Sequence, residues 1–166
     1  MLIVFLVGAA AAAPSFRAGI LGEFLLHPGV FATVAHAPTS EGAWRPIVGA
    51  RTGGYVHPGH HTAAFVHGEA GIRRRGRAVE LDLMAGAGLH YRWLPAPVVV
   101  RDGDGLDTVL DGGRPNLLGL VGLRVGDADG TVRPFGRFDV WWRGPENRGL
   151  RTELVVALGI AFGGTP

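Results

Sequence analysis

The chain has 166 residues, 28 of them glycine and none cysteine, and its 16 basic residues are all arginine against 14 acidic residues. Without cysteine there is no disulfide framework, thiolate metal site or lipoprotein anchor, and so much glycine is typical of tight turns and crowded strands rather than helices. A net charge of +2, with arginines spread along the chain, lacks the concentrated basic patch of a nucleic-acid-binding protein, so we expect no nucleic-acid partner.

The first thirteen residues predict an export signal. The run from Leu2 to Ala13 carries no charge, ends in five alanines and is followed by Pro14 and Ser15. An apolar core of about 7 to 15 residues before small residues is typical of a secretory signal peptide, and it is shorter than the roughly 20 residues of a membrane-spanning helix. We therefore expect residues 1–13 to be a signal peptide cleaved near 12–15, and residues 14–166 to form a single β-barrel domain.

Runs with a period of two follow along the rest of the chain and predict eight strands. We place them near 16–26, 30–37, 43–56, 61–73, 78–93, 116–126, 132–143 and 150–162. Most of these runs exceed the roughly 9 to 11 residues that a tilted strand needs to cross a bilayer. Turn-forming residues separate them, including 27–29 and 57–59, and only residues 94–115 are expected to form a long loop.

The last strand shows most clearly what kind of sheet this is. One parity is large and apolar, from Leu150 to Phe162, whereas the other mixes Arg151 and Glu153 with very small residues. Large apolar side chains toward lipid and charged or small ones toward a narrow lumen are typical of a transmembrane β-strand. The sequence therefore predicts an all-β fold, an eight-stranded antiparallel up-and-down transmembrane β-barrel.

A soluble lipocalin-like carrier is an alternative with the same strand pattern. It would turn the large apolar parity inward around a small ligand and the other parity toward water. Residues such as Gly86, Gly88, Gly159 and Ala161 would then make a poor soluble surface. The membrane barrel is the interpretation that the sequence favours.

The positions of the aromatic residues agree with a barrel that crosses a membrane. An even number of strands leaves both termini on one side, which we expect to be the periplasm. The turns near residues 28, 58 and 146 and the loop 94–115 then face outward. Aromatic residues fall at both sets of strand ends, as interfacial girdles do: Tyr91, Trp93 and Trp142 at the outer rim, and Phe16, Trp44 and Phe162 at the inner rim.

Five short motifs carry a resemblance to known proteins: His27-Pro28-Gly29, Gly68-Glu69-Ala70-Gly71, Gly86-Ala87-Gly88-Leu89-His90-Tyr91, Arg137-Phe138-Asp139 and Leu158-Gly159-Ile160-Ala161-Phe162. They look like a group of uncharacterised bacterial outer-membrane β-barrel proteins, and the overall organisation resembles the small barrels of the outer membrane protein A and X type. The resemblance implies an outer-membrane location but no activity. It also implies a monomer in contact with outer-membrane lipid and lipopolysaccharide, and assembly by the barrel assembly machinery, which reads a late aromatic residue such as Phe162.

The charged parity predicts a luminal charge network. Its members are Glu23, Arg51, Glu69, Asp82, Arg124, Arg137, Asp139, Arg151 and Glu153. An eight-stranded barrel is only wide enough for its own side chains, and an unpaired charge inside it would be costly, so we expect these residues to pair and fill the lumen. Glu69 and Asp139 should be the most fully paired acids. We therefore predict a structural or surface-binding protein with a plugged lumen and no cofactor, rather than a conducting pore.

A lipid A-modifying enzyme, a deacylase or acyltransferase, is the second alternative. Such chemistry needs a hydroxyl beside a histidine that is oriented by an acid. Serine occurs only at Ser15, in the predicted cleavage region, and at Ser40, in a predicted turn. His61-Thr62 and His67 with Glu69 are the nearest imitations of such a site, and the Thr62 hydroxyl should point to lipid. We therefore predict no catalytic residue.

Histidines gather at the predicted outer rim and suggest a metal site. His57, His60 and His61 are the candidate ligands, since neutral imidazole binds zinc, copper or nickel. Their spacing is not a standard ligand motif, and Pro58 and Gly59 explain the turn without any metal. Polar interfacial residues are therefore the alternative interpretation.

The only basic run is Arg73-Arg74-Arg75-Gly76-Arg77. The predicted topology puts it on the periplasmic side, where it could meet anionic headgroups or cell-wall polymer. A solvated turn is the simpler interpretation. An inverted barrel would instead present these guanidinium groups to the phosphates of lipopolysaccharide.

Overall fold

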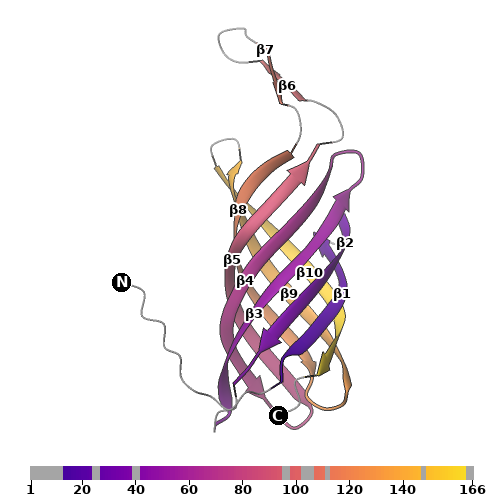
Figure 1. The fold of residues 1–166 in the computed structure, drawn as a ribbon, viewed down its shortest axis with the longest axis vertical. Coiled ribbons are helices and arrows are strands. Elements are labelled where there is room, and N and C mark those ends of the chain that lie inside the picture. The colour runs from indigo at the N-terminus through magenta and orange to yellow at the C-terminus, as the bar shows by residue number, and fades with distance from the viewer. Residues whose placement is uncertain are drawn as a thin grey trace, which may run out of the picture.

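The protein forms a closed barrel of eight antiparallel strands in a computed structural model, which describes residues 13–23, 27–38, 42–94, 98–101, 107–110, 113–146 and 149–163. The barrel strands are β1 (Ser15–Glu23), β2 (His27–His36), β3 (Trp44–His57), β4 (His61–Arg75), β5 (Val79–Trp93), β8 (Gly113–Asp127), β9 (Val132–Glu146) and β10 (Gly149–Gly163). Figure 1 shows them tilted around an elongated cylinder. The eight-stranded up-and-down barrel predicted from the sequence is confirmed.

Closure of the barrel is made by β1 and β10. Their register runs from Ser15 opposite Gly163 to Glu23 opposite Val155. A closed sheet supplies hydrogen-bond partners along its first and last strands, which a bilayer requires because backbone groups cannot be hydrated there. We call the end of the barrel that holds Ser15 and Gly163 the terminal end.

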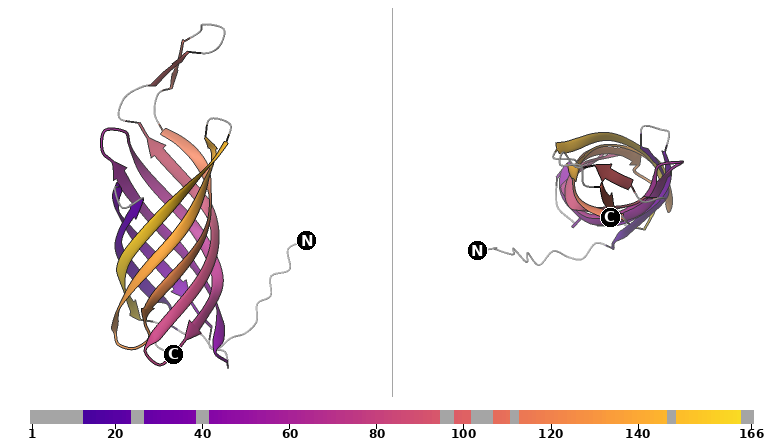
Figure 2. Two further views of the ribbon diagram at one scale, coloured as in Figure 1. Left: turned by 180° about the vertical axis from the view of Figure 1, so that it is seen from behind. Right: turned by 90° about the horizontal axis from the view of Figure 1, so that it is seen from above.

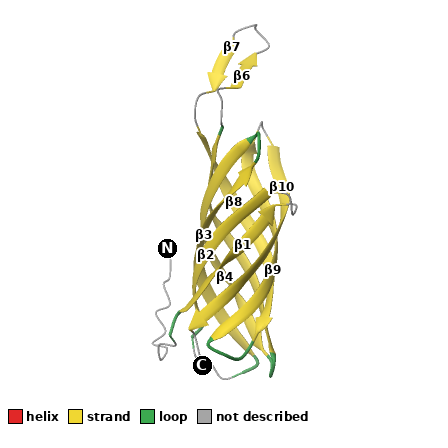
Figure 3. Cartoon of the chain, turned by 90° about the vertical axis from the view of Figure 1, so that its right-hand side faces the viewer, coloured by secondary structure: helices red, strands yellow, loops and turns green. Residues whose placement is uncertain are grey.

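The opposite end carries the connection between β5 and β8, and we call it the hairpin end. This connection was predicted to be a long loop, but it contains a two-stranded sheet of β6 (Val98–Arg101) and β7 (Asp107–Leu110). Both strands stand beyond the barrel rim in Figures 1 and 3. The residues that pair include Val98, Val99 and Val109, whose branched side chains favour extended backbone.

One predicted turn is wrong. Residues 27–29 were expected to form a turn, but they begin β2, where Pro28 pairs with Gly22 of β1. A proline is tolerated in the first residues of a strand because few ladder hydrogen bonds are lost there. Residues 24–26, between β1 and β2, lie outside the described residues. The predicted signal peptide falls largely there too, since the described chain begins at residue 13.

The two faces of the sheet have the polarity of a membrane barrel. Large apolar side chains on the outer face are exposed, among them Ile20, Val66, Leu89, Leu117 and Leu158. Most charged residues of the other parity are buried inside the ring that Figure 2 shows end-on. This arrangement is the opposite of what a soluble lipocalin-like carrier requires. In the part of the chain that the structure describes, no helix is long and apolar enough to span a membrane.

Candidate functional site

The lumen at the terminal end holds a cluster of three arginines and two acids. Asp82 accepts from Arg17 Nη2 at 3.0 Å, from Arg73 Nε at 2.8 Å and from Arg124 Nε at 2.7 Å. Glu80 pairs with Arg124 and lies 3.3 Å from Arg73 Nη1. All five side chains are nearly fully buried. The strand alternation places them here, since each lies on the inward parity of β1, β4, β5 or β8.

A second cluster fills the middle of the lumen. Arg51 Nη1 lies 2.6 Å from Asp139 Oδ2, and Arg137 Nε lies 2.6 Å from Asp139 Oδ1. Arg137 Nη1 reaches Glu69 Oε2 at 2.7 Å, and the other oxygen of Glu69 lies 2.7 Å from Nε2 of His67. Two guanidinium groups therefore face two carboxylates, so the charges of the arginines and the acids balance. Both acids are buried and accept from two partners each.

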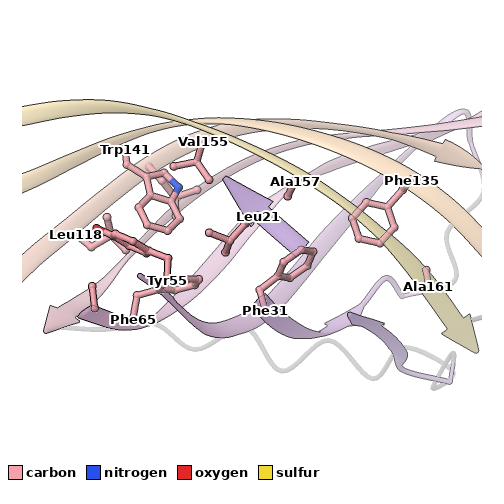
Figure 4. Packing of buried hydrophobic residues seen from close by; sticks show 12 residues of the cluster. Leu21, Phe31, Tyr55, Phe65, Leu118, Phe135, Trp141, Val155, Ala157 and Ala161 are labelled. Atoms are coloured by element: carbon pink, nitrogen blue, oxygen red, sulfur yellow. The ribbon is translucent and has the colours of Figure 1, made fainter. Parts of the chain in front are cut away.

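Aromatic rings pack around this middle cluster. The Arg51 guanidinium lies 4.4 Å from the centre of the Phe31 ring and 5.8 Å from that of Phe65. Phe65 also packs edge-on against Trp141, with ring centres 4.9 Å apart. Figure 4 shows Phe31, Phe65, Trp141 and Phe135 among the side chains inside the barrel. Aromatic rings thus share the interior with the ion pairs, a feature that the charge pattern of the sequence did not predict.

A third cluster lies toward the hairpin end. Arg143 Nη1 donates to the Tyr55 hydroxyl at 2.8 Å and to His90 Nε2 at 2.8 Å, and Arg143 also pairs with Glu153. The Tyr55 hydroxyl also lies 3.0 Å from Nε2 of His90, so Arg143, Tyr55 and His90 all contact one another. Arg151 Nε lies 3.0 Å from the same Glu153.

The structure places the nine predicted network residues as follows. Seven are buried in the three clusters: Arg51, Glu69, Asp82, Arg124, Arg137, Asp139 and Glu153. Arg151 does not lie inside the lumen as predicted but at its mouth, with 44% of its side chain exposed, because β10 begins only two residues away at Gly149. Glu23 lies on β1 opposite Val155, and its side chain falls outside the described residues.

Arg143 and Tyr55 are the members that the sequence analysis missed. Arg143 shares the inward parity of Asp139 and Trp141 on β9, so the signal was present in the alternation. Arg73 shares the inward parity of His67 and Glu69 in the sequence, and the structure places it in the lumen against Asp82.

The rim histidines contact one another at the hairpin end. The rings of His27 and His57 stack with centres 3.6 Å apart, and the centres of His60 and His61 lie 4.4 Å and 5.1 Å from that of His57. Within the described ranges, no group of three or more histidines and acids is arranged to hold a metal ion. Metal binding by His57, His60 and His61 stays a prediction.

The candidate residues for lipid-modifying chemistry do not come together in one site. Ser15 is the one serine within the described residues, and its hydroxyl donates to the carbonyl of Ala35 at 3.2 Å. It starts β1 at the terminal end, whereas His67 belongs to the middle cluster with Glu69. Thr62 is exposed on the outer face. Ser40 falls outside the described residues.

The closed eight-stranded ring, the apolar outer wall and the charged interior together define an outer-membrane β-barrel protein. The chain is similar to the N-terminal β-barrel domain of Pseudomonas aeruginosa OprF, with 12% identity, a TM-score of 0.53, and coverage of 92% of this chain and 97% of that domain. It is also similar to Neisserial surface protein A (NspA), with 13% identity, a TM-score of 0.53, and coverage of 90% and 94%. No protein-family model matches the sequence. A search of curated proteins also gives no match.

Proposed function

We propose that the protein is a non-conducting barrel whose plugged lumen makes it a rigid membrane anchor with a structural or surface-binding role. The observation that carries this proposal is that each luminal cluster contains a contact between strands on opposite sides of the ring. Arg17 on β1 meets Asp82 on β5 at 3.0 Å, four strands away in the barrel order. Arg51 on β3 meets Asp139 on β9 in the same way.

The third crossing, between Arg143 on β9 and Tyr55 on β3, closes the hairpin end at 2.8 Å. A hydrated ion entering the lumen would have to separate these groups at three successive levels. Removing one partner of a buried charge pair costs about 3 to 5 kcal/mol, because the other charge is left uncompensated. The same contacts hold opposite walls together, which supports a role as a rigid anchor.

Conductance across a planar lipid bilayer tests the plugged lumen. The refolded wild-type protein should give no steady current steps. A pore of known conductance, inserted under the same conditions, is the control that shows that such steps can be detected. The Arg51→Ala/Asp139→Ala variant should give intermittent steps, because it removes the middle crossing. Steady, uniform steps from the wild-type protein would overturn the proposal.

The connection that carries β6 and β7 supports the surface-binding part of the proposal. It projects beyond the rim at the end opposite Ser15 and Gly163, as Figure 3 shows, and we propose that this end faces the cell exterior. Protease added to intact cells should cut within residues 95–112 and leave the barrel strands whole. A variant in which a short Gly-Ser linker replaces residues 95–112 should still fold, because the barrel strands pair without this segment. Protection of the segment in intact cells would contradict the orientation.

We also propose that the protein is not an enzyme and works as a monomer assembled by the barrel assembly machinery. The hydrogen bond that occupies the Ser15 hydroxyl supports the first point. Phe162, exposed at the terminal end, supports the last, because it presents an aromatic ring near the end of the closing strand. Phe162→Ala should slow assembly in cells, and Phe16→Ala, its partner on β1, is the matched control.

A further inference from the structure

The basic run 73–77 is divided by the strand alternation into two structural arginines and two that face outward. Arg73 points into the lumen and pairs with Asp82 and Glu80. Arg75, on the same parity, donates to the carbonyl of Ala128 at 2.8 Å and lies 3.1 Å from Asp129. Arg74 lies on the outer parity between them, and Arg77 is exposed in the turn that follows β4.

Arg74 is held beside a tryptophan at the edge of the apolar wall. It stands directly opposite Trp44 in the register of β3 and β4, and its guanidinium lies 5.6 Å from the centre of the Trp44 ring. Ile72, two residues farther into the membrane on the same face, is 44% exposed. Arg74 therefore sits where the apolar wall ends, at the depth where tryptophan rings anchor barrels among lipid headgroups.

Neither outward arginine is neutralised within the described part of the chain. No ion pair joins Arg74 or Arg77 to a carboxylate there. The nearby acid Asp129 pairs with Arg75 instead. The charge is thus available to a group that comes from the membrane. A guanidinium group donates two parallel hydrogen bonds to phosphate oxygens. Because the indole ring already restricts the Arg74 side chain, the arginine loses less conformational entropy when it binds phosphate.

We propose that Trp44, Arg74 and Arg77 form a binding surface for the headgroup of an anionic phospholipid in the leaflet at the terminal end. Phosphatidylglycerol has the required chemistry, since its phosphodiester carries a charge that no amine of its own balances. The indole ring packs against the glycerol region, and the two arginines meet the phosphate. Each basic residue near an anionic surface contributes about 1 kcal/mol, so the preference over a zwitterionic lipid should be roughly fivefold if one arginine contributes and about thirtyfold if both do.

Quenching of Trp44 by brominated lipids measures this preference directly. The Trp93→Phe/Trp142→Phe background removes the other two exposed tryptophans, and Trp141 is fully buried in the lumen, beyond the reach of lipid. The protein is refolded into vesicles that contain either brominated phosphatidylglycerol or brominated phosphatidylcholine at equal mole fraction. The expected result is several-fold stronger relative binding of phosphatidylglycerol, which falls toward equality in high salt.

Matched variants separate the surface from its surroundings. Arg74→Gln/Arg77→Gln should abolish the preference, and Arg74→Lys should keep part of it. Arg75→Gln is the control from the same run, and it should leave the preference unchanged because Arg75 is already paired with Asp129 and donates to the carbonyl of Ala128. Migration on an unheated gel shows that each variant is folded.

Equal quenching by the two lipids in the wild-type background would overturn the proposal, and so would an unchanged preference in Arg74→Gln/Arg77→Gln. Should that variant fail to fold, the lipid exchange and the salt titration on the folded parent protein still decide the question. Loss of the preference on adding inorganic phosphate at constant ionic strength would also overturn it, because it would identify a site for a free anion rather than for a lipid.

Discussion

Arg51 and Asp139 meet across the full width of the barrel, with Nη1 of Arg51 2.6 Å from Oδ2 of Asp139 and both side chains fully buried. Their strands, β3 and β9, lie on opposite sides of the ring. Arg137, on the same strand as Asp139, binds the second carboxylate oxygen at 2.6 Å. Asp139 is therefore the group that ties the two walls together, and the stability of the barrel should depend on it.

Removal of both members of this pair should cost less than the sum of the two single removals. Arg51→Ala leaves Asp139 with one guanidinium instead of two, and the expected loss is about 3 to 5 kcal/mol of unfolding free energy. The Arg51→Ala/Asp139→Ala variant should lose less than the sum of the single variants, because neither charge is then left without its partner. Urea unfolding in lipid vesicles, followed by tryptophan fluorescence, measures the cycle. Strictly additive losses would show that the contact contributes nothing.

Gly122 should be intolerant of a side chain although alanine is otherwise common on these strands. A Cβ placed on Gly122 would overlap Oδ1 of Asp139 and come within 3.1 Å of Nη2 of Arg137. Asp139 cannot move away without breaking its ion pairs, so Gly122→Ala should cost about 1 to 3 kcal/mol. Gly119→Ala, whose new Cβ meets no atom within 4 Å, is the control and should change stability by less than about 0.5 kcal/mol. Similar losses in both variants would contradict this prediction.

The sequence could predict which face each residue occupies, because a strand alternates strictly, but not which residues meet across the lumen. Asp139 and Glu69 were expected to be well paired, and the alternation of side chains along their strands is sufficient to predict that both lie in the lumen. Their partners depend on the register between strands and on the tilt of the barrel, which bring Arg51 to Asp139 over 88 positions of sequence. Arg143 lies on the same inward parity as Asp139, so the alternation was sufficient to place it in the lumen, but its contacts with Tyr55 and His90 depend on the register. The strands of residues 98–110 were missed because a short hairpin outside the membrane has no alternation of lipid and lumen faces.

A charge placed on the outer wall should destabilise the protein according to its depth. Val121 lies near the middle of β8 and is exposed on the apolar face, whereas Val79 starts β5 at the terminal end. Val121→Arg should cost about 2 to 4 kcal/mol and Val79→Arg about 0 to 1 kcal/mol, because only the first guanidinium is held far from water. Unfolding in lipid vesicles measures both. Equal costs would place the membrane at a different height on the barrel.

The rim histidines give a prediction about metal that the ring geometry sharpens. His27, His57, His60 and His61 pack through their rings, so a metal ion would have to replace these stacking contacts with bonds to nitrogen. Binding of zinc should therefore be measurable by calorimetry on the refolded protein and should separate the stacked rings, with a loss of binding in the His57→Ala/His60→Ala/His61→Ala variant. His67→Ala is a suitable control, because His67 lies in the middle cluster against Glu69. Equal zinc binding by the wild type and the triple variant would leave the histidines as polar residues of the interface, held together by their rings alone.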